Sequence, residues 1–409
     1  MGRASGYILT VLSVCLLLSV AAEAQVYDSV YLAKVRDSVE RYYRLHPRQK
    51  MDREERAFRV QPLYGVMFTE ETRFTAMGGF MGMYRSSADS LVPLSSVGAV
   101  AMLSTNLSGG GAVTGQWYAP GGRFTVVYSA RFINSPRRFW GLGFESASDD
   151  SNQGHLTSRK VRVRSDFLYR KGRMLLAGGF AGYDFYHAAE ISGPAGIGNA
   201  PVRTHYVTAG ARLDLDTRDS VQAPSRGVFL NVEQSVNIPL YGSGGVFSRT
   251  EVTADFYFPM WEGGVLALDI YGNISSSGAP WTVWPDAGGD VRLFSEKAAR
   301  SVPRRGEIPV IPIRGDVRLR GYYQGRYRDR NLLAAQVELR QRVYRAHGVA
   351  LWGGAGYVFP SFREFDIKNT LPTYGAGYRL SVMGIVLRLD VGFGLRGQYA
   401  VIAGVSHSF

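Results

Sequence analysis

The chain contains very little cysteine. Among its 409 residues the only one is Cys15, which lies in an apolar N-terminal stretch. We expect that stretch to be removed as a signal peptide, which would leave a mature chain without cysteine. This composition excludes a disulfide framework, a thiol nucleophile and a thiolate metal site.

The sequence also lacks a segment suited to a transmembrane helix. Its longest apolar stretch, Tyr7–Val20, follows Arg3 and precedes the small-residue site Ala22-Glu-Ala24, so we predict a secretory signal over residues 1–24. A lipoprotein signal that uses Cys15 is the weaker alternative, because the apolar run continues beyond the cysteine. No later segment offers ~18 consecutive apolar residues.

Catalytic and nucleic-acid-binding patterns are missing as well. The histidines show no metal-ligand spacing, and there is no G-x-S-x-G nucleophile turn. The acidic pairs Glu70-Glu71 and Asp149-Asp150 fall in predicted loops, where solvated charge is the ordinary role. The formal charge of +13 suits a charged rim, a cationic lumen or contacts with lipid phosphates. We therefore expect no enzyme, no cofactor, no metal and no nucleic-acid partner.

What the chain does contain is alternation between apolar and polar residues. Hydrophobic residues make up 45% of the sequence, and there are 49 glycines. The end of the chain shows the pattern clearly, because apolar residues recur at every second position before a terminal aromatic. This is typical of the strand that closes an outer-membrane barrel. We expect it to act as an assembly signal through Tyr399, Val401, Gly404, Val405, His407 and Phe409.

Alternating segments of this kind extend from about residue 59 to the end. Only helices and closed barrels satisfy every backbone group inside lipid, so the sequence predicts an all-β protein, a transmembrane antiparallel β-barrel of about 16 strands over residues 59–409. Residues 25–58 are predicted to form a periplasmic amphipathic helix and linker. The predicted strands are 60–67, 73–85, 94–104, 110–118, 123–132, 158–170, 173–187, 203–214, 227–238, 247–257, 264–275, 331–343, 347–357, 372–381, 384–393 and 397–408.

The lengths of the links give the barrel an orientation. An even strand number places both chain ends on the periplasmic side, and short links such as Lys171-Gly172 then fall on that side. The long links 133–157, 188–202 and 276–330 fall outside, which is the asymmetry of bacterial barrels. The link 276–330 is the sixth external loop. Because it is rich in arginine, glycine and tyrosine, we expect it to fold back into a polar lumen.

Three motifs of the predicted barrel resemble a known family. The sixth external loop contains Leu319-Arg320-Gly321-Tyr322, and the last strands contain Leu387-Arg-Leu-Asp390 before the aromatic end. A predicted periplasmic turn carries Asp216, Arg218, Asp219, Pro224 and Gly227. Together, in this order, they resemble the bacterial surface antigen family, the barrel domain of BamA/TamA-type outer-membrane assembly proteins.

The resemblance implies an inserted loop that is anchored by Arg320. The acidic residue expected opposite this arginine is replaced by Gly354, so we expect Glu338 or Asp390 in the lumen to be its partner. Glu338 is preferred because its strand directly follows the loop, and a charge exchange between Arg320 and Glu338 would then partly restore the anchor. We expect the tryptophans, by contrast, to serve mainly as anchors at the membrane interfaces; they are Trp117, Trp140, Trp261, Trp281, Trp284 and Trp352.

The resemblance also implies a location and a function. We expect an integral, non-enzymatic barrel in the outer membrane of a Gram-negative bacterium, which assists the insertion or translocation of polypeptides. The partners implied are outer-membrane lipid and lipopolysaccharide, the barrel assembly machinery during biogenesis, and client or other envelope proteins. We expect no POTRA domain in residues 25–58, unlike the family's assembly members. A passive pore and a structural or surface-binding barrel therefore stay open as alternatives.

Overall fold

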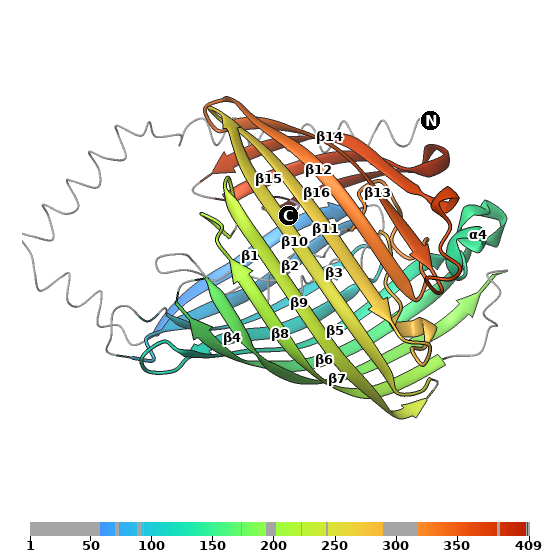
Figure 1. Cartoon of the computed structure of the whole chain (residues 1–409), viewed down its shortest axis with the longest axis horizontal. Helices are drawn as coiled ribbons and strands as arrows, with labels where there is room; N and C mark the ends of the chain where they lie inside the picture. The colour runs from blue at the N-terminus through green and yellow to red at the C-terminus, as the bar shows by residue number, and fades with distance from the viewer. Residues whose placement is uncertain are drawn as a thin grey trace, which may run out of the picture.

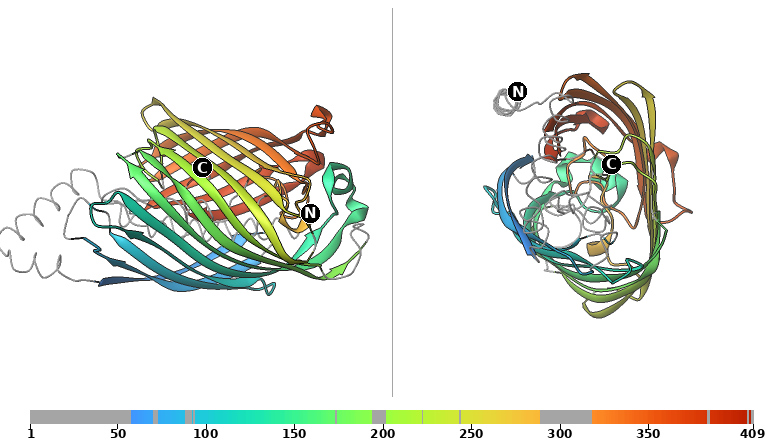
Figure 2. Two further views of the ribbon diagram at one scale, coloured as in Figure 1. Left: turned by 60° about the horizontal axis from the view of Figure 1, so that its bottom comes forward. Right: turned by 90° about the vertical axis from the view of Figure 1, so that its left-hand side faces the viewer.

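The chain folds as a closed antiparallel barrel of sixteen strands, each paired with its neighbours in the sequence. The computed structural model describes residues 58–69, 73–87, 92, 94–172, 174–193, 202–221, 223–242, 244–288, 318–382, 385–405 and 407. Figure 1 shows the strands tilted across the barrel, and the end-on view of Figure 2 shows them as a ring. The strands are β1 (Phe58–Thr69), β2 (Arg73–Tyr84), β3 (Ser95–Ser104), β4 (Gly109–Tyr118), β5 (Phe124–Phe139), β6 (Gly154–Lys171), β7 (Leu175–Ser192), β8 (Val202–Asp216), β9 (Gly227–Gly242), β10 (Phe247–Trp261), β11 (Gly264–Ser275), β12 (Asn331–Tyr344), β13 (His347–Phe359), β14 (Leu371–Val382), β15 (Ile385–Phe393) and β16 (Tyr399–Val405).

The predicted barrel and its strand number are confirmed. The predicted boundaries are too short at the loop end, where β5 reaches Phe139 and β6 begins at Gly154. A short helix, α4 (Gly143–Ser148), and a 3₁₀ turn, η1 (Asp150–Asn152), lie in the link between them. The loop-end parts of these strands contain more charge and less alternation than the rest, which hides them from a pattern of lipid-facing residues.

The barrel is apolar outside and charged inside. On β12, the outward Val337 is 43% exposed, whereas the inward Gln336 and Glu338 are fully buried. On β8, Leu213 is 43% exposed while Arg212 and Asp214 are buried. Successive strand residues face opposite sides, so the register of β8 and β12 places these charged side chains in the lumen. This arrangement suits a barrel that is surrounded by lipid.

None of the described helices is long and apolar enough to cross a membrane. The predicted signal peptide at 1–24, the predicted helix and linker up to residue 57, and the terminal Phe409 lie outside the described residues. The same holds for residues 289–317 of the sixth external loop. Its two flanks, 276–288 and 318–330, are described and reach into the barrel.

Interface anchoring is wrong for four of the six tryptophans, since Trp281 and Trp284 are partly buried in the sixth-loop segment inside the barrel. Trp117 and Trp261 are 38% and 55% exposed on the barrel surface, as expected for interface anchors. Trp140 and Trp352 are buried, because they face the segment of the sixth loop that occupies the lumen. Sequence position near a strand end cannot distinguish these two environments.

Candidate functional site

The Leu319–Tyr322 motif lies against the inner wall formed by β13, β14 and β15. Glycines on that wall allow the close approach. A Cβ added at Gly392 would lie 2.9 Å from the backbone nitrogen of Gly321, and one added at Gly356 would lie 2.5 Å from a methyl of Leu319. Gly321 itself has φ of 108°, a conformation that favours glycine. The wall and the loop therefore fit only because these positions lack side chains.

Arg320 is fully buried at the centre of this contact. Its guanidinium group donates to both carboxylates named from the sequence: it pairs closely with Glu338, and its Nη1 lies 3.4 Å from Asp390 Oδ2. Its Nε donates to Gln336 Oε1 at 3.2 Å. The same group lies 3.8 Å from the ring centre of Trp352, in the range of a cation–π interaction.

The two carboxylates are shared with further arginines of the wall. Glu338 also accepts from Arg340, whose Nε lies 2.6 Å away, and from Arg379 at 3.4 Å. Asp390 pairs closely with Arg379 and lies 3.0 Å from Arg388. We call this group the lumen network; it comprises Arg320, Arg340, Arg379, Arg388, Glu338 and Asp390. With four guanidinium groups around two carboxylates, it has no simple one-to-one pair.

Gln336 occupies the space where the family's acidic residue is expected. It pairs in register with Gly354, and a Cβ on Gly354 would lie 2.8 Å from Gln336 Cγ. Besides accepting from Arg320, Gln336 donates from Nε2 to the carbonyl of Arg318 at 2.6 Å. A glutamine on the neighbouring strand therefore takes over part of the anchoring.

The rest of the motif is held by apolar packing and by backbone groups. The hydroxyl of Tyr322 donates to the carbonyl of Pro372 at 2.5 Å and accepts from the Leu395 amide at 3.0 Å. The Thr373 hydroxyl donates to the carbonyl of Arg320. Leu319 and Tyr322 join one buried cluster with Trp140 and other lumenal residues. The loop thus forms a plug with its own core.

The predicted periplasmic turn is tightly organised. Arg218 is buried, donates to Asp216 at 2.8 Å and lies over the Phe229 ring at 4.3 Å. Asp219 accepts the backbone amides of Ser220, Ser225 and Arg226 at 3.1, 2.9 and 3.3 Å. Partial burial raises the pKa of the Asp219 carboxyl, but the hydrogen bond from the Ser225 hydroxyl and those from the three amides outweigh it and lower this pKa. A Cβ on Gly227 would lie 2.5 Å from the Thr217 carbonyl oxygen.

This turn is connected to the lumen network. Pro224 is buried, and its carbonyl accepts from Arg340 Nη1 at 3.3 Å. Because Arg340 also binds Glu338, a chain of contacts extends from the external loop through Arg320 and Glu338 to the periplasmic turn. The sequence places both motifs in the barrel, but only the register of β12 brings them into one network.

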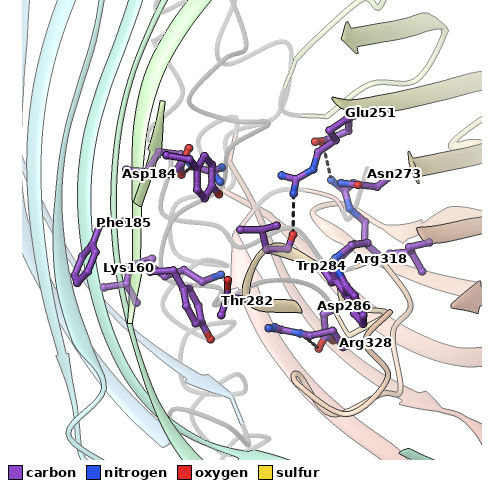
Figure 3. Close-up of a pocket in the computed structure, with 18 of the residues that line it drawn as sticks. Lys160, Asp184, Phe185, Glu251, Asn273, Thr282, Trp284, Asp286, Arg318 and Arg328 are labelled. Carbon is purple, nitrogen blue, oxygen red and sulfur yellow. Dashed lines mark hydrogen bonds and ion pairs between the residues drawn. The ribbon is translucent and has the colours of Figure 1, made fainter. Parts of the chain in front are cut away.

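A cavity of about 130 Å³ lies between the loop and the opposite wall. Figure 3 shows Lys160 and Asp184 on the wall side of this cavity, with Arg318, Asp286 and Arg328 across from them; the side chain of Phe185 points away from the cavity. Arg328 Nε lies 3.8 Å from Asp286 Oδ2. Burial raises the pKa of Asp286 to about 6, since desolvation outweighs the attraction of Arg328 and Arg137.

Several functional residues are missing from the sequence-based prediction. Gln336, Trp352, Thr373 and Arg379 contact Arg320 or its carboxylates. All four share an inward position on a strand, a signal that the sequence provides for polar and aromatic residues as well as for acidic ones. Among the residues of the predicted assembly signal, Tyr399 is 45% exposed on the outer surface. Val405 is the last residue of β16, and His407 lies beyond the strand.

Comparison with known proteins shows similarity in fold. No family model matches the chain, and no curated protein matches its sequence. Among solved structures, BamA from Haemophilus ducreyi lacking POTRA domains 1–3 aligns with a TM-score of 0.56 and 10% identity, over 86% of this chain and 70% of that one. CdiB from Acinetobacter baumannii aligns with a TM-score of 0.50 and 10% identity, over 86% of this chain and 60% of that one. CdiB from Escherichia coli aligns with a TM-score of 0.52 and 12% identity, over 85% of this chain and 62% of that one.

These alignments confirm the expected barrel fold of BamA/TamA-type proteins. The chain spans less than two thirds of the two CdiB chains. At identities of 10–12% the likeness concerns the path of the backbone.

Proposed function

We propose that this protein is a non-enzymatic outer-membrane barrel that assists the insertion or translocation of polypeptides. The barrel fold, the inward charge and the resemblance to outer-membrane assembly proteins support the location and the broad class. The observation that carries the proposal is the closure between β1 and β16.

The described part of the closing seam has little backbone pairing. Among the described residues, the register between β1 and β16 holds one pair, Thr69 with Ile402, whereas β1 and β2 pair along their whole length. Continuing the seam register would set Val66 against Val405, but no pair is formed there. Each missing pair removes hydrogen bonds that a closed barrel needs inside lipid. Such a seam requires less free energy to open than the fully paired junctions between the other strands. Its opening would expose strand edges to a client segment.

A cysteine pair across the seam tests this proposal. We expect Thr69→Cys with Ile402→Cys to form a disulfide, because directly opposed strand residues have a suitable Cα separation of roughly 5 Å. Locking the seam should reduce the abundance of other outer-membrane proteins when this variant is the cell's only copy. Reduction should restore it. The measurement is a quantitative profile of the outer-membrane proteome after depletion of the wild type.

The control places the same bond elsewhere in the barrel. Ala209→Cys with Val236→Cys joins opposed residues of β8 and β9 and should leave the proteome unchanged. An oxidised seam variant with a normal proteome would reject the proposal. High conductance of the wild type in planar bilayers would then favour the passive pore, although the buried plug of the sixth loop speaks against that alternative.

A further inference from the structure

A row of basic residues lies on the outer surface of β6, β7 and β8, three adjacent strands in Figure 1. Arg159 is directly opposite His187, and His187 is directly opposite Arg203. We call these three residues the cationic row. They share the strand face of Val163 and Val207, which are 45% and 37% exposed. The row therefore lies on the lipid-facing side, near the ends of the strands that lead to the external loops.

An aromatic row lies next to it, toward the middle of the barrel wall. Phe185 is opposite His205, and His205 is opposite Tyr241. The ring centres of Phe185 and His205 are 4.7 Å apart, and those of His205 and Tyr241 are 5.9 Å apart. Aromatic rings of this kind mark the interface between hydrocarbon and headgroups. The cationic row lies two residues from the aromatic row along the strands, about 7 Å closer to the external loops. This displacement places it at the level of lipid phosphates.

The charges of the row are only weakly compensated by the described protein. Arg203 is exposed and has no ion pair with a described residue. Arg159 lies 3.9 Å from Glu190, and the two side chains are 43% and 71% exposed, so this pair contributes little. Arg159 Nε also donates to Asn134 at 3.2 Å. Arg159 and Arg203 lie on either side of His187, so an anion between them can accept hydrogen bonds from both guanidinium groups.

His187 points to a ligand independently of the two arginines. Only 9% of this residue is exposed, yet its Nε2 has no hydrogen-bond partner in the described structure. A buried polar atom without a partner is costly. Its position between Arg159 and Arg203 places the unpartnered nitrogen at the centre of the row.

We propose that the cationic row binds the phosphomonoester of a lipid in the outer leaflet, with the aromatic row against the adjoining part of the lipid. A phosphomonoester carries a charge of about −1.5 to −2 near neutral pH, which matches two guanidinium groups better than the single charge of a diester. Guanidinium groups bind phosphate oxygens through paired N–H donors. The inference rests on the proposed outer-membrane location and is separate from the proposed role in handling polypeptides.

Native mass spectrometry of the purified barrel in detergent tests the site. The probes are bisphosphorylated lipid A, its dephosphorylated form and phosphatidylglycerol. We expect the wild type to bind lipid A at least tenfold more tightly than either other lipid. Arg159→Gln with Arg203→Gln should remove that preference. Arg342→Gln changes an exposed arginine at the opposite rim, with a side chain 60% exposed, and should have no effect.

Three outcomes would overturn the proposal. Equal binding of dephosphorylated lipid A would remove the role of phosphate, and equal binding of phosphatidylglycerol would leave only general attraction to anionic lipid. Displacement of lipid A by equimolar inorganic phosphate would identify a phosphate-ion site instead of a lipid site. Heat-modifiable gel mobility establishes whether each variant is folded. If the double variant is not folded, the single variant Arg203→Gln replaces it in the binding measurement. The double variant should still support normal outer-membrane protein levels, so failure of the lipid site and failure of the seam proposal are distinguishable.

Discussion

At the scale of single residues, the anchoring of the sixth loop depends on a buried arginine with several partners. Arg320 contacts Glu338, Asp390, Gln336 and the ring of Trp352. The carboxylates in turn bind other arginines, so each negative charge is shared among several guanidinium groups of the lumen network. A charge exchange between Arg320 and Glu338 would place the new arginine beside Arg340 and Arg379. The exchange is therefore not expected to restore the anchor, contrary to the expectation for an isolated pair.

Arg320→Ala is expected to release the loop. Removing one member of a buried ionic group leaves the remaining charges desolvated, at a cost of about 3 kcal/mol. Trypsin should then cleave within residues 276–330, and conductance through the lumen should rise. Arg342→Ala, at an exposed site, is the control. An unchanged cleavage pattern in Arg320→Ala would show that the loop does not depend on this residue.

The pKa of Asp286 makes the loop sensitive to pH. Burial raises this pKa to about 6 from an ordinary value near 3.9, so the folded loop favours the protonated carboxyl. The stabilisation is fully present below about pH 4 and is lost as the pH rises through 6. Limited proteolysis should therefore cut the loop faster at pH 7.5 than at pH 5.

Asp286→Asn tests the source of that dependence. The amide cannot ionise, so this variant should show a smaller change in cleavage rate between the two pH values. Burial also raises the pKa of Asp329 to about 6, and the double variant Asp286→Asn with Asp329→Asn should show almost none. A double variant with the wild-type pH dependence would contradict the assignment.

At the scale of elements, the inner wall of β13 and β15 is shaped to receive the loop. Glycines stand where the motif approaches, and bulky side chains occur elsewhere on the same strands. Gly394, just beyond β15, shows the same complementarity, because an added Cβ would lie 2.8 Å from the Tyr322 ring. The fit between two distant elements thus depends on missing side chains as much as on ion pairs.

Gly392→Ala is expected to displace the motif from this wall. The added methyl would lie 2.9 Å from the Gly321 nitrogen, and overpacking of this kind costs about 1–3 kcal/mol. Loop cleavage by trypsin should increase. Gly353→Ala is the matched control, since its Cβ would meet only the Thr373 carbonyl oxygen at 3.9 Å. Equal cleavage of the two variants would argue against close backbone approach at Gly392.

At the scale of the whole molecule, the barrel combines a sparsely paired seam, as far as its described residues show, with a lumen occupied by the described flanks of the sixth loop. The loop stabilises the part of the wall that it contacts, whereas sparse pairing makes the seam easier to open. The plug connects β12, β14 and β15 through the lumen network and contacts β13 through Trp352. The pairing of β16 with β1, by contrast, is limited among the described residues. Any opening is therefore expected at the seam and not at the plugged wall.

Deletion of Phe409 is expected to impair assembly. The terminal aromatic ends the alternating sequence pattern that we interpret as an assembly signal. The truncated chain should show lower abundance in the outer membrane and more degradation in the periplasm, measured by fractionation and immunoblotting. Replacement by Tyr, which keeps the aromatic ring, should preserve the level. Normal abundance of the truncated chain would show that the last residue is dispensable.

The sequence by itself determined the barrel, its strand number and the position of the sixth loop, because alternation and link length are local properties of the chain. It also indicated Glu338 and Asp390, since both occupy inward positions next to the motif. Only the tertiary structure decided that Arg320 binds both carboxylates, that Gln336 fills the place opposite Gly354, and that Arg340 connects this group to Pro224. These contacts depend on strand register and on the path of the loop, which bring together residues far apart in the chain.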